Sequence, residues 1–206
     1  MKRKILVSGS IGVLVLTMLV LGLWYTRPGE MDDGIAVPAL MSFQYKDPGV
    51  ALKYGILGYV EISLPQDSPL RKENQLPVKR GGEINIPLLL TFVSHTPELK
   101  EVGVVLDPTL REGVVWVEKY YVVTDEKGNV VKRDRFIVND YLSYNLKRVL
   151  IKAGETLPVI LTVHIPQDFP PVSSFTLNPF GIKSENRQVV AFSDMKAKVH
   201  WEVIIP

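Results

Sequence analysis

The sequence predicts an all-β protein, an antiparallel β-sandwich ectodomain on one N-terminal transmembrane helix. One observation is an uncharged run of 21 residues, Ile5–Tyr25, directly behind three basic residues. A second is the alternation of apolar and polar residues from Leu52 onward, with the period of two that is typical of half-buried strands. A third is the spacing of turn signals, which divides this region into about nine short segments, as in a sandwich.

The apolar run has the length and flanks of a membrane span. At about 1.5 Å per residue, a helix of this length covers roughly 31 Å, the thickness of a hydrocarbon core. Trp24 and Tyr25 end the run, where amphipathic rings prefer the interface. Lys2, Arg3 and Lys4 precede it and only Arg27 follows closely. The positive-inside rule therefore predicts a cytoplasmic N-terminus and an extracytoplasmic main domain.

A cleaved signal peptide is the alternative for the same segment. Against it, the run exceeds the usual apolar region of about 7–15 residues, and no A-x-A-like cleavage site follows. We therefore expect an uncleaved signal anchor. Both the anchor and the signal-peptide interpretation place the rest of the chain outside the cytoplasm. The predicted organisation is a tail and anchor at 1–27, a juxtamembrane linker at 28–50 and the sandwich domain at 51–206. Pro28-Gly29 and Pro48-Gly49 are typical of such a linker.

The charge distribution argues against nucleic-acid binding. The chain has 24 Lys and Arg against 22 Asp and Glu, but four of the basic residues flank the apolar run. The exported part therefore has a net charge of −2, with both signs interspersed. A nucleic-acid interface needs basic residues clustered on one face. There is no cysteine, which removes disulfides, thiolate metal sites and thiol nucleophiles.

Four segments show the alternation clearly: Ile56–Leu64, Ile84–Phe92, Val159–Ile165 and Ala197–Val203. Further strands are predicted at Glu101–Leu106, Gly113–Thr124, Val130–Val138, Arg148–Ile151 and Val189–Phe192. Asp125–Asn129 is predicted to be a hairpin loop, because its glycine can adopt a positive φ. Outside the membrane, the best helix candidate is the short segment Asn139–Lys147. A closed barrel remains the alternative to the sandwich.

A local pattern adds a resemblance to this reading. The segment Lys152-Ala153-Gly154-Glu155 leads into a strand that ends at Ile165-Pro166. This pattern resembles Ig-like domains of archaeal and bacterial surface proteins, of the adhesion-related and NEW3 types. The resemblance implies an Ig-like fold with an adhesive or supporting role, and it brings no catalytic residues.

No catalytic or cofactor-binding constellation is recognisable. The sequence holds three histidines, His95, His164 and His200, whereas a catalytic zinc needs three protein ligands and a structural zinc four. There is no G-x-S-x-G elbow and no phosphate-binding loop. We therefore predict no enzyme activity, no cofactor, no metal and no small-molecule substrate.

Aromatic residues and prolines between Pro166 and Asn186 give the candidate partner-binding residues. This stretch shows no strand pattern, and long structureless loops in compact domains are usually functional. Exposed phenylalanines there would anchor a partner, whereas Phe175 and Phe180 would alternatively plug the end of the sandwich. The candidates are Phe169, Pro170, Pro171, Phe175 and Phe180.

These observations predict a non-enzymatic accessory or structural subunit of a membrane or cell-envelope complex. Its expected partners are membrane lipid and other membrane or envelope proteins. The alternative is an anchored receptor or adhesin that binds a sugar, a peptide or an envelope polymer. A third possibility is an exported enzyme with two close carboxylates in a pocket.

Overall fold

A computed structural model describes residues 45–110, 117–179, 181–193 and 200–206. The chain divides into two compact units, 1–32 and 33–206, and every described residue belongs to the second. The predicted anchor and most of the predicted linker lie outside the described residues. In the described part of the chain, no helix combines the length and the apolar character that a membrane span requires.

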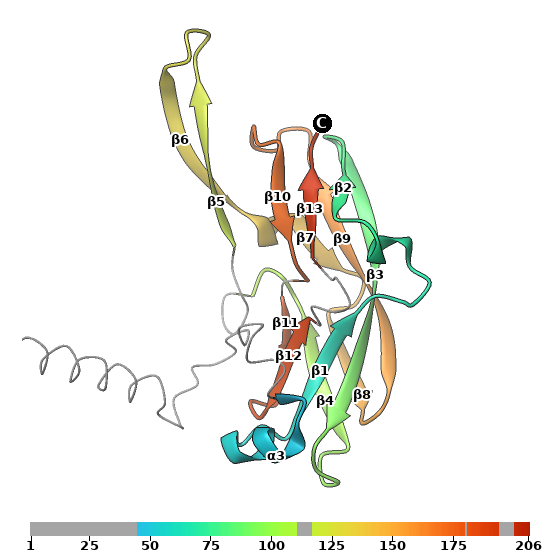
Figure 1. Ribbon diagram of the computed structural model, residues 1–206. Coiled ribbons are helices and arrows are strands. Elements are labelled where there is room, and N and C mark those ends of the chain that lie inside the picture. The colour runs from blue at the N-terminus through green and yellow to red at the C-terminus, as the bar shows by residue number, and fades with distance from the viewer. Residues whose placement is uncertain (1–44, 111–116, 180, 194–199) are drawn as a thin grey trace, which may run out of the picture. The chain divides into compact units, whose positions relative to one another are not determined.

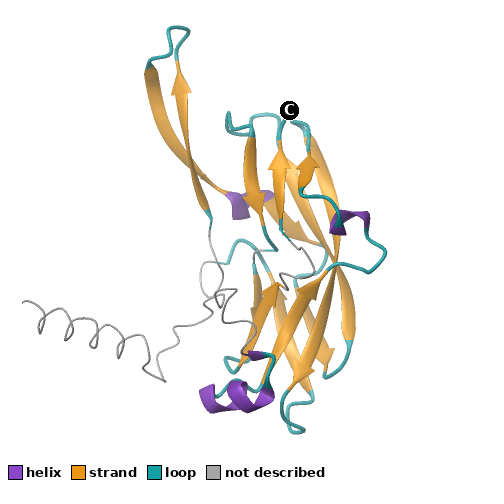
Figure 2. Cartoon of the chain, viewed as in Figure 1, coloured by secondary structure: helices purple, strands orange, loops and turns teal. Residues whose placement is uncertain are grey.

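The described residues form an all-β fold with short helical segments (Figures 1 and 2). The strands are β1 (Gly58–Ser63), β2 (Gln75–Pro77), β3 (Gly82–Ser94), β4 (Glu101–Leu106), β5 (Glu118–Thr124), β6 (Val130–Ile137), β7 (Leu142–Tyr144), β8 (Arg148–Lys152), β9 (Thr156–Ile165), β10 (Ser174–Leu177), β11 (Ile182–Ser184), β12 (Val189–Ser193) and β13 (Trp201–Ile204). The helical segments are α3 (Pro48–Ala51) and the 3-10 turns η1 (Leu52–Tyr54), η2 (Pro69–Arg71) and η3 (Val138–Tyr141).

Three sheets share one hydrophobic core. The largest has the strand order β12-β1-β3-β9-β7, and two smaller sheets have the orders β10-β13-β2 and β11-β4-β8. Each sheet ends in edge strands, and residues of all three belong to the same buried cluster. The fold is therefore a β-sandwich of open sheets, as predicted, and the barrel alternative is wrong for this part of the chain.

Two of the three sheets contain a parallel pair, which corrects the prediction of an antiparallel sandwich. β1 pairs with β12 in parallel, and β13 pairs with β2 in parallel. Both pairs join segments that are far apart in the sequence. Tight hairpins force neighbouring strands to be antiparallel, and long connections remove that constraint.

The alternating residues supply the core. Four residues of β3 have no exposed area: Ile86, Leu88, Leu90 and Phe92. Leu161 and Val163, on the neighbouring strand β9, belong to the same buried cluster. Trp201 on β13 is also buried, and its indole N–H donates to the Leu70 carbonyl at 3.3 Å. The period-two alternation therefore identifies the buried face of these strands correctly.

Packing starts earlier than the predicted domain boundary at residue 51. Tyr45 is buried with Ala51 and Ile56 in a small second cluster. The ring nitrogen Nε2 of His95 donates to the Tyr45 carbonyl at 2.6 Å, and Lys46 forms a 3.0 Å ion pair with Glu61. The last residues of the expected linker are thus fixed to the sandwich.

Two secondary-structure predictions are wrong. Asn139–Lys147 does not form a helix, because the 3-10 turn η3 ends at Tyr141 and β7 then pairs with β9. The stretch Pro166–Asn186 is not structureless, because it contains β10, which pairs with β13, and β11, which pairs with β4. In both places, pairing with a distant strand outweighs the local sequence pattern.

Candidate interaction site

β5 and β6 form a two-stranded sheet of their own (Figure 1). Asp125–Asn129 connects them, as predicted: the Asp125 N–H donates to the Asn129 carbonyl at 2.9 Å, and Gly128 has a φ of +82°. The Asp125 carboxylate accepts bonds from the amides of Lys127 and Asn129. The loop chemistry therefore fixes the register of the two strands.

This hairpin exposes large apolar side chains. Tyr120 is 74% exposed, Val122 50%, Val130 51% and Val131 61%. Elsewhere in the described chain, the exposed large apolar residues are Leu52, Tyr54, Leu146, Leu150 and Ile160. A two-stranded hairpin is marginally stable by itself and its apolar residues are uncovered, so this element has the features of an interaction site.

An aromatic cluster holds the root of the hairpin, which we define as Val117, Tyr121 and Phe136, against the sandwich. Phe136 is buried, and its ring centroid lies 5.3 Å from that of Phe169 and 6.1 Å from that of Phe175. Tyr121 lies 6.4 Å from Phe136 on the hairpin side. Tilted and edge-on rings at these separations attract one another and fix the orientation of the hairpin.

A buried asparagine fixes the root from the other side. The Asn139 amide has no exposed area, accepts a 3.1 Å bond from the Val117 N–H and donates a 3.1 Å bond to the Pro108 carbonyl. Gly181 packs directly on Pro108, with a φ of +79°. One amide therefore joins the start of β5 to the turn after β4.

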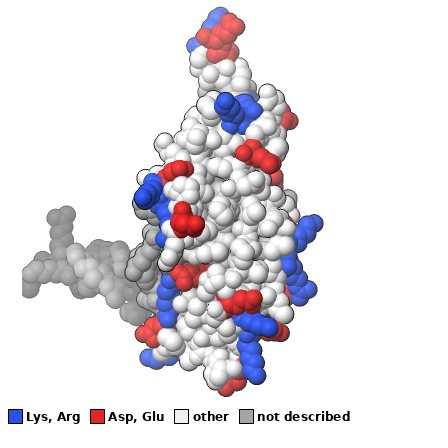
Figure 3. Space-filling model, turned by 90° about the vertical axis from the view of Figure 1, so that its right-hand side faces the viewer, with Lys and Arg blue, Asp and Glu red and all other residues white. Residues whose placement is uncertain are grey.

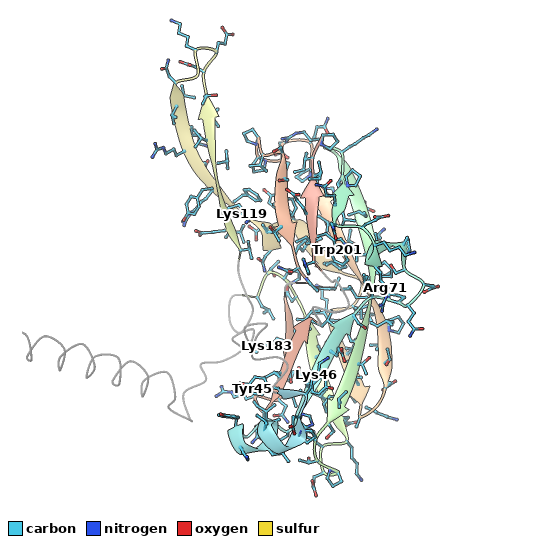
Figure 4. All side chains as sticks on the ribbon, in the orientation of Figure 1. Tyr45, Lys46, Arg71, Lys119, Lys183 and Trp201 are labelled. Atoms are coloured by element: carbon cyan, nitrogen blue, oxygen red, sulfur yellow. The ribbon has the colours of Figure 1, made fainter. Side chains whose placement is uncertain are left out.

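Ion pairs occupy both acidic residues of the two strands, Glu118 and Asp134. Arg135 pairs with Glu118 at 2.8 Å, and Lys132 pairs with Asp134. The hydrogen bond from Lys132 lowers the pKa of Asp134, and the charge of Glu118 raises the pKa of Arg135. Figure 4 labels Lys119 near the start of β5, and the described residues provide it with no acidic partner.

The residues predicted to bind a partner lie beneath this hairpin or outside the described chain. Phe169 and Phe175 are each 3% exposed, so Phe175 lies in the core, as its alternative interpretation expects, and Phe169 is buried as well. Pro170 is half-buried and Pro171 is exposed, and Arg80 donates to the carbonyls of Phe169 and Pro170. Phe180 lies outside the described residues. Whether any of them touches a partner stays a prediction.

Sequence reasoning predicted the hairpin as a structure and missed it as a surface. The available signal was the run Tyr120-Tyr121-Val122-Val123, which lacks the polar alternation of a half-buried strand. A strand that is apolar on both faces must be covered on both faces. The described residues cover only its root.

A polar groove of about 700 Å³ lies beside the sheet β10-β13-β2. The Glu202 carboxylate in it accepts bonds from Ser174 at 2.8 Å and Gln75 at 3.2 Å. Arg71, labelled in Figure 4, donates to the carbonyls of Leu64 and Pro65 and thereby holds the neighbouring loop. The groove is lined by Glu73, Asn74, Gln75, Thr176, His200, Trp201 and Glu202.

The described residues contain no cluster of three or more His, Cys, Asp or Glu side chains that could hold a metal ion. His164 is exposed on β9, His200 is exposed just before β13, and His95 donates the bond to the Tyr45 carbonyl. Charged residues of both signs are interspersed over the face shown in Figure 3.

No protein-family model matches the sequence, and no curated protein matches it significantly. Among solved structures, the chain is similar to PapD-like domain 7 of human CEP192, with a TM-score of 0.34 and 12% identity over 71% of this chain and 84% of that one. It is also similar to a family 123 glycoside hydrolase from Clostridium perfringens, with a TM-score of 0.32 and 8% identity over 71% of this chain and 26% of that one. Likenesses at these scores assign neither family nor activity.

Proposed function

We propose that the protein is a non-enzymatic, membrane-anchored accessory or structural subunit of a membrane or cell-envelope complex. In this proposal, residues 5–25 anchor the chain, the sandwich lies outside the cytoplasm, and the β5–β6 hairpin docks to a neighbouring protein. The sandwich is further proposed to be Ig-like, and this finer assignment rests on the resemblance of residues 152–166.

One observation carries the proposal: β5 exposes Tyr120 and Val122, while aromatic contacts and the Asn139 bonds hold the root of the hairpin. Exposed apolar groups cost solubility unless something covers them, so such a patch marks an interface. The aromatic cluster and Asn139 set the hairpin in one orientation before binding. A pre-oriented surface loses less conformational freedom when a partner docks.

The test is gentle detergent extraction of the full chain from native membranes, followed by sizing and mass spectrometry. The proposal expects companion proteins in fixed proportion to the chain. A stable, monodisperse monomer from native membranes would contradict it.

The polar groove favours a second candidate, an anchored receptor or adhesin for a sugar. Its amides, carboxylates and hydroxyl match the hydroxyl groups of a saccharide as hydrogen-bond donors and acceptors. The matched test compares glycan binding by the full chain and by Gln75→Ala, which removes one of the groove's amide groups. Glycan binding that Gln75→Ala weakens would support this candidate, and a chain that binds no glycan would exclude it.

A further inference from the structure

We propose that the outer edge of β5, at Tyr120–Val123, binds an extended segment of a partner protein as an added β-strand. The segment carries an acidic residue that meets Lys119. This inference rests on the proposed function, because it names the partner chemistry at the same hairpin.

The edge of β5 that faces away from β6 is open in the described chain. β5 pairs with β6 through Glu118–Thr124, and the described residues place no strand on its other side. In an antiparallel pair, about half of the backbone N–H and C=O groups of each strand point away from the partner strand. An edge of this kind is a template for another strand.

The two edges of the hairpin, on β5 and on β6, differ in charge and regularity. β6 carries four consecutive charged residues, Lys132–Arg135, and a bulge at Val131, where the register shifts opposite Val123 and Thr124. Charges and bulges are the devices that block strand addition. β5 instead carries five consecutive uncharged residues, Tyr120–Thr124, with no proline. Strand addition is therefore favoured on β5 alone.

A strand added beside β5 would cover apolar side chains of the hairpin. Tyr120 and Val122 point to one face of the hairpin, which they share with their cross-strand partners Arg135 and Arg133. Tyr121 and Val123 point to the other face. A strand beside β5 places its own side chains next to both sets, because successive residues alternate between faces. One extended segment thus covers apolar groups on both faces.

The charges of the hairpin favour an acidic partner segment. Glu118 is held by Arg135 and by the Tyr120 hydroxyl, which donates to it at 2.9 Å. Lys119 has no acidic partner among the described residues. The two strands together contain four basic and two acidic residues, and with their loop the hairpin contains five and four, whereas the exported part of the chain is net negative. An acidic segment is attracted to this hairpin, and a basic segment is repelled.

The experiment uses the full chain in lipid nanodiscs and three capped nine-residue peptides that alternate Val and Thr. One peptide carries Glu near one end, one carries Lys at that position, and one is the Glu peptide with alternate backbone nitrogens methylated. The readout is amide exchange and chemical shift along β5 and β6. We expect the Glu peptide to protect the Tyr120–Val123 amides, and to bind at least about tenfold more tightly than the other two.

Matched variants test the edge and the charge separately. Val122→Glu on β5 should abolish binding of the Glu peptide, whereas Val131→Glu on β6, at a comparably exposed valine, should leave it within about twofold. Lys119→Glu should reverse the preference, so that the Lys peptide binds better. Both the reversal and the β5–β6 difference go beyond what a nonspecific loss of stability produces.

Three results would overturn the inference: equal binding of the methylated peptide, protection on β6 instead of β5, or no binding of the Glu peptide. Protection of β5 that rises with protein concentration without peptide would also overturn it, because a second copy would then be the occupant. If native extraction yields companions while the peptide experiment fails, the strand-addition inference falls and the proposed function stands. If no companions are found, the proposed function itself fails.

Discussion

Asn139→Ala is expected to release the root of the hairpin. The Asn139 amide is fully buried and bonds the Val117 N–H and the Pro108 carbonyl, both at 3.1 Å. The substitution leaves one donor and one acceptor without these partners. Each unsatisfied buried group costs about 1–3 kcal/mol. Because Val117 is only partly buried, water relieves some of that cost, and we expect a loss of about 2–4 kcal/mol.

Hydrogen exchange of the full chain in nanodiscs measures this loss directly. Amides of β5 and β6 should exchange about 30- to 1,000-fold faster in Asn139→Ala, since about 1.4 kcal/mol corresponds to a factor of ten. The matched control is Asn145→Ala, which removes an exposed amide that accepts from the Ile160 N–H at 2.8 Å. Water can replace that bond, so the control should change exchange by less than about threefold. Equal effects of the two variants would refute the assigned role of Asn139.

Three further predictions concern the core, a turn and the hairpin loop. Phe169→Ala removes a buried ring beneath the hairpin and should lower the free energy of unfolding by about 3–5 kcal/mol, measured by chemical denaturation. Gly181→Ala should prevent stable folding, because its Cβ would lie 2.3 Å from Pro108 Cα. The control Gly55→Ala also has a positive φ, of +72°, but open space around it, and should cost only about 1–2 kcal/mol of folding free energy. Equal melting temperatures of the two variants would contradict this. Hydrogen bonds, chiefly from Asn129, lower the pKa of Asp125, so its stabilisation of the loop is present above the ordinary pKa of about 4 and lost as the pH falls through the lowered value; an acid titration followed by NMR should show the loop opening in the wild type and no such transition in Asp125→Asn.

The long strands could be predicted from the sequence because each carries several periods of alternation. Residues 84–92 and 159–165 lie within β3 and β9, and 101–106 coincides with β4. The hairpin could be predicted because Asp125–Asn129 has turn chemistry of its own. Local interactions decide these elements, so local sequence suffices.

The missed elements depend on distant partners. β2, β7, β10 and β11 have three or four residues each, which is too short for a periodic signal. β10 exists because β13 provides its ladder, although the two are separated by more than 20 residues. The helix expected at Asn139–Lys147 fails because the Asn139 side chain is committed to Val117 and Pro108, and β7 to β9.

The candidate site was only partly predictable for the same reason. The sequence indicates that Tyr120–Val123 is an uncharged strand and that Phe169 and Phe175 are prominent apolar residues. It does not indicate which of these groups the fold covers. The structure buries Phe169 and Phe175 and leaves Tyr120 and Val122 exposed.

Docking through β5 is tested most directly by comparing native complexes of three full-length chains: wild type, Val122→Glu and Val131→Glu. Each is extracted gently from native membranes, sized, and analysed by quantitative mass spectrometry. We expect companions in fixed proportion for the wild type and for Val131→Glu, and their loss for Val122→Glu with the fold intact. A solitary wild-type chain, or companions that persist equally in Val122→Glu, would contradict it.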